Sequence, residues 1–298
     1  MSFRIVQSKQ NARLKELRQA LSRPGRLSQT APEGDGPKNG LDHSAARKGR
    51  LAGIEGVNLL EEALRAGLHV ECVFVALGAE PLLNTIPLVP DTEVLLLSRE
   101  LLDSVLTTEA PQPVAALVEP PHWDWNDLLD KERQGPSAKH IPLVMVLAGL
   151  QDPGNLGTVL RSAEAFGATG VVSLPGTVSA WNPKAVRASA GSIFRLPLLV
   201  ATADNAFPYL REAGLRILTT AIQGAESAHA VDLEVPVALV IGNEGNGVSD
   251  EIAAQCDAAL TIPCPGPVES LNASVAASIL LYETARQRSA KLSAGSRR

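Results

Sequence analysis

Residues 142–166, PLVMVLAGLQDPGNLGTVLRSAEAF, carry the clearest signal of the fold class. Its first seven residues form an apolar run, which predicts a short buried strand. Pro153 and Gly154 then predict a turn. After the turn, apolar side chains return every three or four positions up to Phe166, and this spacing predicts a helix. A strand that passes through a tight turn into a helix is the building unit of an α/β sheet.

The same alternation continues toward the C-terminus. Strands are predicted at 142–148, 170–174, 197–200, 215–220, 235–241 and 258–262. Helices are predicted at 156–166, 183–190, 204–213, 249–255 and about 270–288. Short apolar strands separated by helices are typical of a mostly parallel sheet covered on both faces. Ligands of such sheets bind beyond the carboxyl ends of the strands.

The residues before this region predict a second, smaller α/β domain at 1–118. Its predicted helices are 11–21, 54–67 and 98–106, and its predicted strands are 70–77, 93–97 and 114–118. Residues 22–49, rich in Gly, Pro, Ser and charge, predict a flexible insertion. Residues 119–140 predict a linker to a second domain at 141–298. Within the linker, we expect Trp123 and Trp125 to pin the chain to a domain surface rather than to stack on bases.

Composition excludes several classes of protein. The 298 residues are 45% hydrophobic and 20% charged, which excludes wholesale disorder, collagen and coiled coils. No apolar run approaches the roughly 18 residues that span a bilayer, and the N-terminus has no continuous apolar signal region. The three cysteines show no pairing pattern, which favours reduced thiols. We therefore expect a cytoplasmic protein without a membrane segment.

The net charge of −5 hides an uneven distribution. Residues 1–50 carry a net charge of +7 and residues 286–298 carry +5, so the middle of the chain is acidic. Basic tails can contact phosphates, and a solvated, disordered tail is the alternative. Charge alone leaves nucleic-acid binding open.

The first candidate motif follows the strand at 142–148. Asn155 is expected at the N-cap of the next helix. Arg161 lies away from the apolar stripe of that helix. Gly157 precedes Arg161 by four residues, so the two share a face on which a substrate could approach the guanidinium. A capped helix with a solvated arginine is the alternative.

The second motif, Gly242-Asn243-Glu244-Gly245-Asn246-Gly247, also follows an apolar strand. Its glycines permit close approach of the backbone to a ligand. Their order is not GxGxxG and no GK[ST] follows, so neither phosphate-loop pattern fits. A glutamate inside the loop suits a cation, a hydroxyl or an amide better than a phosphate. An ordinary glycine-rich turn is the alternative.

The third motif runs from Ile262-Pro263 through a proline-rich loop to Ser270-Leu271-Asn272. Ser270 and Asn272 are expected to open the last helix, whose free N–H groups attract anions or carbonyls. Cys264 is expected to be a small buried thiol rather than a nucleophile. One apolar stripe of that helix comprises Leu271, Val275, Ile279 and Tyr282. The tripeptide Asn272-Ala-Ser274 also fits a glycosylation sequon, which we discount because no signal peptide is present.

Together the motifs resemble the SpoU (TrmH-type) family of RNA ribose 2′-O-methyltransferases, within the knotted SPOUT class. The resemblance covers about residues 142–288. It is carried by Asn155-x-Gly157-x-x-x-Arg161, by Gly242-x-Glu244-Gly245-x-Gly247, and by Ile262-Pro263 with Ser270-Leu271-Asn272. Family members typically carry Met where this chain has Cys264. The front part looks like the small RNA-binding domain that often precedes this domain, through Ser8-Lys-Gln-Asn11-x-Arg13-x-Lys15 and Gly53-Ile-Glu-Gly56. The insertion at 22–49 has no counterpart that we can place.

The resemblance implies an α/β fold with a C-terminal knotted sheet domain, and methyl transfer from S-adenosylmethionine to a ribose 2′-hydroxyl without a metal. Arg161 would clamp a phosphate and activate the hydroxyl, while the general base stays unassigned. Asn155 would orient the ribose or Arg161, and Glu244 would organise its loop. Ser270 and Asn272 would bind substrate phosphate or order the knot. Cofactor contacts would come from Thr220, Gly242, Asn243, Gly245, Ile262, Leu271 and Ala276.

The resemblance also implies partners. RNA contacts would come from Lys9, Arg13, Lys184 and Arg187, with a solvated helix surface as the alternative for the last two. The segment 183–192 resembles ribosomal-RNA members of the family, so ribosomal RNA is favoured over transfer RNA. A homodimer is expected. A catalytically silent ribosome-assembly factor is one alternative, and intact Asn155 and Arg161 argue against it. An ordinary nucleotide-binding α/β enzyme is another, and it lacks the required glycine pattern.

Overall fold

The computed structural model describes residues 3–22, 51–90, 92–108, 110–129, 141–221, 224–267 and 270–295. The insertion predicted at 22–49 therefore lies outside the described residues, apart from Ser22, and so does the second half of the predicted linker, residues 130–140. The chain divides into two compact units. Unit 1 comprises Met1–His122 and Ser179–Arg195, and unit 2 comprises Trp123–Val178 and Leu196–Arg298. Each unit is described by itself.

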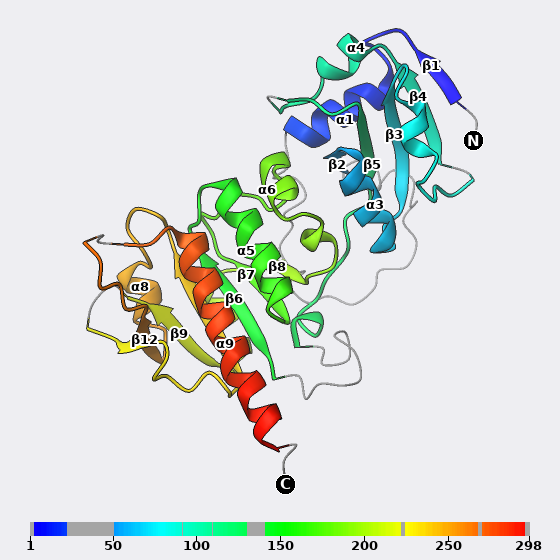
Figure 1. The fold of residues 1–298 in the computed structure, drawn as a ribbon. Coiled ribbons are helices and arrows are strands. Elements are labelled where there is room, and N and C mark those ends of the chain that lie inside the picture. Colours follow the sequence, from blue (N-terminus) through cyan, green and yellow to red (C-terminus); the bar gives the residue numbers. More distant parts are fainter. Residues whose placement is uncertain are drawn as a thin grey trace, which may run out of the picture. The chain divides into compact units, whose positions relative to one another are not determined.

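The described part of unit 1 contains a five-stranded mixed sheet (Figure 1). In spatial order its strands are β1 (Phe3–Val6), β4 (Glu93–Leu97), β3 (Val70–Ala76), β5 (Val114–Val118) and β2 (Ala52–Glu55). The first three run parallel, and β5 runs antiparallel to β3 and to β2. The helices are α1 (Ala12–Ser22), α3 (Val57–Arg65) and α4 (Arg99–Asp103), with a 3₁₀ turn η2 (Glu80–Leu83). Leu14, Leu17 and Leu21 bury the predicted stripe of α1 in the core.

Two short strands of unit 1 were not predicted. β1 and β2 each have four residues, too few to show a periodic pattern. The helix predicted from residue 54 begins at Val57 instead, because Ile54 and Glu55 belong to β2. Gly56 separates the strand from the helix with φ 101°, a backbone conformation that glycine adopts without a steric penalty.

The segment Ser179–Arg195 packs with unit 1 although it lies within the domain predicted at 141–298. It contains α6 (Pro183–Ala188) and the 3₁₀ turn η4 (Ser192–Phe194). Helix α6 packs against β2, and its Ala185 and Val186 are buried. Sequence order and spatial grouping therefore differ here, and the edge strand β2 is covered rather than exposed.

A tight bend and an ion pair hold this segment in unit 1. Ala190 and Gly191 have φ values of 49° and 90°, so the chain turns sharply between α6 and η4. Arg195 Nη1 then lies 2.5 Å from Glu62 Oε2 on α3. The hydrogen bond from Arg195 and a second from Arg65 lower the pKa of Glu62. The carboxylate is therefore held ionised against two guanidinium groups.

The described part of unit 2 contains a seven-stranded, fully parallel sheet (Figure 1). In spatial order its strands are β10 (Glu226–Ser227), β12 (Ala258–Thr261), β9 (Arg216–Thr220), β11 (Val237–Gly242), β6 (Leu143–Ala148), β7 (Gly170–Ser173) and β8 (Leu198–Val200). Its helices are α5 (Pro153–Ala165), α7 (Ala203–Glu212), α8 (Asp250–Ala253) and α9 (Ala273–Gly295). Every predicted strand is present within two residues of its expected bounds, and only the two-residue β10 among these strands was not predicted.

The topology brings the candidate motifs to one edge of the sheet. From β6 the chain proceeds through β7 and β8 on one side, and then returns to β9, β11 and β12 on the other. The order therefore reverses between β6 and β11, which is where parallel sheets bind ligands. Because these strands are parallel, their carboxyl ends share an edge.

The tryptophans behave as predicted. Trp123 and Trp125 pack against the core cluster of unit 2, and the Trp125 ring lies 4.7 Å from that of Tyr209 on α7. They thus pin the chain that enters unit 2 to its surface. None of the helices in the described ranges combines the length and the apolar character that crossing a bilayer requires.

Replacing Gly191 by alanine should destabilise the protein more than the same change at Gly78. Both glycines have positive φ, so each alanine costs about 1 kcal/mol of backbone strain. A Cβ on Gly191 would also lie 2.7 Å from Glu62 Cβ, whereas nothing lies within 4 Å of one on Gly78. Overpacking adds roughly 1–3 kcal/mol. Equal losses of unfolding free energy in chemical denaturation would contradict this difference.

Candidate active site

Three chain segments meet at the side chain of Asn155, in the first turn of α5. Its Nδ2 donates to Glu244 Oε1 at 3.0 Å, in the loop after β11. Its Oδ1 accepts from Asn272 Nδ2 at 3.0 Å and lies 3.2 Å from Ser274 Oγ, at the start of α9. Because a carboxylate only accepts hydrogen bonds, the amide nitrogen must face Glu244. The loop after β6, the loop after β11 and the start of α9 are thus joined through one amide.

Asn155 is not the N-cap of α5, contrary to the sequence prediction. The N-cap is Asp152, whose side chain accepts from the backbone N–H of Asn155 at 2.9 Å. Pro153 occupies the first helical position, where its fixed φ fits and its missing N–H is harmless. The cap therefore falls one residue before the proline. This shift releases the Asn155 side chain for contacts with other segments.

Glu244 ties the loop after β11 to the loop after β6. Its carboxylate accepts from the backbone N–H groups of Gln151 at 3.3 Å and Asp152 at 3.2 Å, in addition to Asn155. Burial alone would raise the pKa of Glu244, but the hydrogen bonds from Asn155 and from backbone N–H groups outweigh it and lower the pKa. Glu244 is therefore held as a carboxylate, and it is a poor proton acceptor.

The glycine-rich loop folds back on itself. Asn243 and Gly247 exchange backbone hydrogen bonds of 2.9 and 3.0 Å. Asn243 Nδ2 donates to Gly149 O at 3.0 Å, and its Oδ1 accepts from Gly245 N at 2.7 Å. A Cβ on Gly242 would lie 2.0 Å from the carbonyl carbon of Gly247. The sequence predicted that a ligand would approach the backbone at Gly242 closely, but the backbone of Gly247 occupies that space instead.

Arg161 presents a cation on α5, six residues after Asn155. Val159 and Ala163 are fully buried, and Arg161 is exposed, as the stripe predicted. Arg161 forms no hydrogen bond or ion pair with any residue in the described ranges. Gly157 is buried, so the open surface expected on the face it shares with Arg161 is absent. An anionic group can reach the guanidinium only from the solvent side of α5.

The third segment differs from its prediction in two places. Helix α9 begins at Ala273 rather than Ser270, and Asn272 acts as its cap, with Oδ1 accepting from Ser274 N at 2.8 Å. Ser270 lies before the cap and is exposed, outside the Asn155 network. Cys264 is exposed, with Sγ 3.4 Å from Ile262 O, so the expected buried thiol is wrong. The proline-rich loop holds it at the surface.

Ser274 is a site residue that the sequence analysis missed. It is 6% exposed, and its Oγ lies 2.7 Å from Asn272 Oδ1 as well as 3.2 Å from Asn155 Oδ1. Its only sequence signal was the discounted sequon, Asn272-Ala-Ser274. A polar residue two positions after a helix cap could have been considered as a partner of that cap.

The residues expected at a cofactor lie along the same edge of unit 2. Thr220 ends β9, and its Oγ1 donates to Val240 O at 3.3 Å on the neighbouring β11. Gly242, Asn243 and Gly245 belong to the folded loop. The remaining candidates flank the proline-rich loop or open α9, and each is half-buried: Ile262, Leu271 and Ala276. In the described residues, no group of three His, Cys, Asp or Glu side chains could hold a metal ion.

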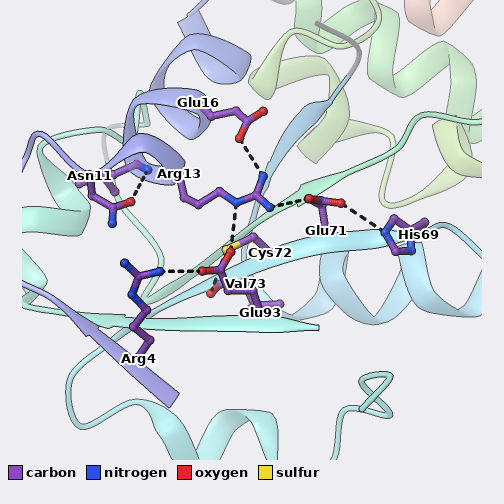
Figure 2. Close-up of polar contacts among 10 residues, drawn as sticks. Arg4, Asn11, Arg13, Glu16, His69, Glu71, Cys72, Val73 and Glu93 are labelled. Atoms are coloured by element: carbon purple, nitrogen blue, oxygen red, sulfur yellow. Dashed lines mark hydrogen bonds and ion pairs between the residues drawn. The ribbon is translucent and has the colours of Figure 1, made fainter. Parts of the chain in front are cut away.

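The expected RNA contacts separate into two kinds. Lys9 is exposed in unit 1, and Lys184 and Arg187 are exposed on α6. Arg13 is instead engaged within unit 1, as Figure 2 shows. Its guanidinium meets Glu71 at 2.5 Å, Glu16 at 3.0 Å and Glu93 at 3.0 Å. Arg13 therefore ties α1 to β3 and β4, and its donors are taken up by carboxylates.

The parallel sheet, with a polar network at its carboxyl edge and an exposed arginine on the helix that follows β6, is typical of an α/β domain that binds a ligand at this edge. Residues 142–282 match the SpoU rRNA methylase family, and residues 46–116 match an MRM3-like substrate-binding domain. The 23S rRNA (guanosine(2553)-2′-O)-methyltransferase RlmP of Bacillus subtilis is 33% identical over 77% of this chain and 86% of its own length. An uncharacterised tRNA/rRNA methyltransferase of Synechocystis is 40% identical over 59% of this chain, which spans 46% of that relative.

A solved structure supports the same assignment. The SpoU methyltransferase AviRb from Streptomyces viridochromogenes, in complex with AdoMet, has a TM-score of 0.72 at 28% identity, over 94% of this chain and 98% of its own. The chain belongs to the SpoU family of RNA methyltransferases. The family resemblance and the α/β fold predicted from the sequence are thereby confirmed.

Replacing Asn155 by aspartate should make stability depend on pH. The change places a second carboxylate at the 3.0 Å contact with Glu244, and like charges raise the pKa of one member of the pair. A carboxyl with a raised pKa destabilises the fold while ionised and stops doing so once protonated. The melting-temperature deficit should therefore shrink as the pH falls from about 8 to about 5.

The size of the deficit at neutral pH should be roughly 1–2 kcal/mol, the cost of a lost hydrogen bond at a partly buried polar group. Asn205→Asp, on the exposed first turn of α7, is the matched control and should show little change. A deficit that is the same at every pH would show that repulsion at Glu244 is not its cause.

Proposed function

We propose that the protein transfers a methyl group from S-adenosylmethionine to a ribose 2′-hydroxyl in RNA, and that this RNA is ribosomal RNA. The observation that carries this proposal is the exposed Arg161, which has no partner within the described ranges and lies on the same helix as Asn155, the centre of the polar network. An exposed guanidinium without a partner in these ranges suits an anionic substrate such as an RNA phosphate.

The residues at the sheet edge fit S-adenosylmethionine. Bound S-adenosylmethionine supplies a methyl group on a positively charged sulfonium, so the proposed reaction requires no metal. Glu244 is a carboxylate that the surrounding hydrogen bonds keep ionised, and a negative charge suits a cationic cofactor better than a phosphate. The cofactor would be held by Thr220, Gly242, Asn243, Gly245, Ile262, Leu271 and Ala276, largely through backbone groups and apolar packing.

Arg161 is the proposed catalytic residue. Its guanidinium would clamp the phosphate beside the target ribose and lower the cost of deprotonating the 2′-hydroxyl. One N–H of the Asn155 amide is donated to Glu244 and its oxygen accepts from Asn272, so we assign Asn155 the role of positioning these groups. Glu244, which its hydrogen bonds hold as a carboxylate, would organise its loop, and the general base stays unassigned. Ser270, exposed before α9, would meet the substrate phosphate.

The proposed RNA contacts of unit 1 are Lys9, Lys184 and Arg187, each exposed. Arg13 is omitted because its guanidinium meets three carboxylates. Two observations favour ribosomal RNA as the substrate. The Bacillus subtilis relative is a 23S rRNA methyltransferase, and segment 183–192 resembles ribosomal-RNA members of the family. We place the reaction in the cytoplasm, together with ribosomal-RNA maturation. Residues 1–118 form the proposed substrate-binding domain and residues 141–298 the methyltransferase domain.

We also propose a homodimer. Helix α9 exposes one apolar stripe, with Val275 at 46%, Ile279 at 37% and Tyr282 at 55% exposure. Tyr282 packs edge-on against Phe166 at the end of α5, with ring centroids 5.9 Å apart. A symmetric partner would bury such a stripe. The trefoil knot of the SPOUT class is part of the same proposal, supported by the meeting of the β11 loop and the start of α9 at Asn155.

Arg161→Ala should reduce the rate of methyl transfer by at least ~100-fold, because the variant loses the only proposed charge contact with the reacting nucleotide. Binding of S-adenosylmethionine, measured by calorimetry, should be largely unchanged. Arg161→Lys should recover only part of the rate, since an ammonium cannot bind a phosphate through two parallel hydrogen bonds. Near-normal turnover of Arg161→Ala with labelled cofactor would remove Arg161 from the mechanism.

Arg187→Gln should weaken RNA binding and flatten its salt dependence. Each lost phosphate contact reduces the slope of log affinity against log salt by roughly 0.7–0.9. Arg216→Gln, an exposed arginine at the start of β9 in unit 2, is the matched control and should leave the slope unchanged. An unchanged slope for Arg187→Gln, measured by fluorescence anisotropy, would exclude a phosphate contact at that position.

A further inference from the structure

Two hydroxyl groups join helices α5 and α9 directly beside Arg161. Ser162 Oγ lies 2.8 Å from Ser278 Oγ. Ser278 also donates to the backbone carbonyl of Ser274, one turn earlier in α9, at 2.7 Å. A serine hydroxyl has a single proton, so Ser278 must accept from Ser162. The bond therefore runs from α5 to α9, and its direction is determined.

This bond is the second of two polar clasps between the helices. The first joins Asn155 to Asn272 and Ser274 at the start of α9. Asn155 and Ser162 are seven residues apart, about two turns, so they lie on the same face of α5. Ser274 and Ser278 are four residues apart and share a face of α9. Between and beyond the clasps, α9 buries apolar side chains, including Ala277 and Leu281.

The two clasps fix the relative position of α5 and α9 more precisely than apolar packing alone does. Apolar contacts are not directional, so two helices held only by them can slide or rotate at low cost. Hydrogen bonds weaken steeply when distance or angle changes. Clasps at both ends fix the register of α5 on α9, and Arg161 extends from α5 immediately before Ser162. A displacement of about 1 Å at a reacting group can cost ~100-fold in rate.

We propose that Ser162 and Ser278 are positioning residues, whose shared hydrogen bond fixes the position of α5, and with it Arg161, relative to α9. The inference rests on the proposed role of Arg161 as the group that contacts the substrate. Neither serine touches a reactant. Their bond holds α5 in one register on α9, and this register determines where the guanidinium of Arg161 contacts the substrate.

The test uses Ser162→Ala, Ser278→Ala and the double variant in the full-length chain. The kcat for methyl transfer should fall about 5-fold to 50-fold, with KM for S-adenosylmethionine unchanged. The double variant should match the worse single variant, because both changes break the same bond. Ser162→Thr retains a hydroxyl and should restore most of the rate. Thr158→Ala is the matched control: Thr158 Oγ1 bonds only its own helix, to Gly154 O at 2.8 Å, and its loss should leave kcat unchanged.

A second measurement does not depend on activity. Hydrogen exchange of the α5 amides around Arg161 should be faster in Ser162→Ala and Ser278→Ala than in Thr158→Ala, because the second clasp is open. Unchanged kcat in an active protein, unchanged exchange, or effects that simply add in the double variant would overturn the positioning role. If the wild-type protein transfers no methyl group, the proposed function fails, and the exchange rates still decide whether the hydroxyl pair holds α5.

Discussion

The site depends on the orientation of one amide. Asn155 donates to Glu244 and accepts from Asn272, so its nitrogen and oxygen cannot exchange places. Through it, the ends of two strands and the start of the last helix share one junction. Glu244 reinforces the junction by accepting from two backbone N–H groups after β6, and these bonds keep it ionised. Arg161, which has no partner among the described residues, is the group proposed to contact the substrate.

The sequence predicted well those features that repeat locally. Apolar runs identified the six longer strands of the parallel sheet, and helical spacing placed Arg161 on the exposed side of α5. The strands β1, β2 and β10 escaped because two to four residues cannot show a period. The N-cap was displaced to Asp152 by the preference of Pro153 for the first helical position.

Features that join distant segments could not be predicted from spacing. Ser274 meets Asn155 across 119 residues, and neither position reveals the other. Arg13 reads as a basic contact in its local sequence, yet it meets Glu71 and Glu93 from two strands of the folded unit (Figure 2). Segment 179–195 belongs in sequence to the methyltransferase domain, yet packs against β2 of unit 1. In each case a long-range contact decides the role of the residue.

If the Asn155 junction supports ribose methylation of ribosomal RNA, its loss should be visible in a map of ribose methylation. Such a map would be measured in ribosomal RNA from cells that lack the gene, complemented with the wild-type gene or with Asn155→Leu at equal protein level. One 2′-O-methyl group should disappear on deletion and return with the wild-type gene but not with Asn155→Leu. A map unchanged by deletion, or restored in full by Asn155→Leu, would show that the junction does not support this reaction.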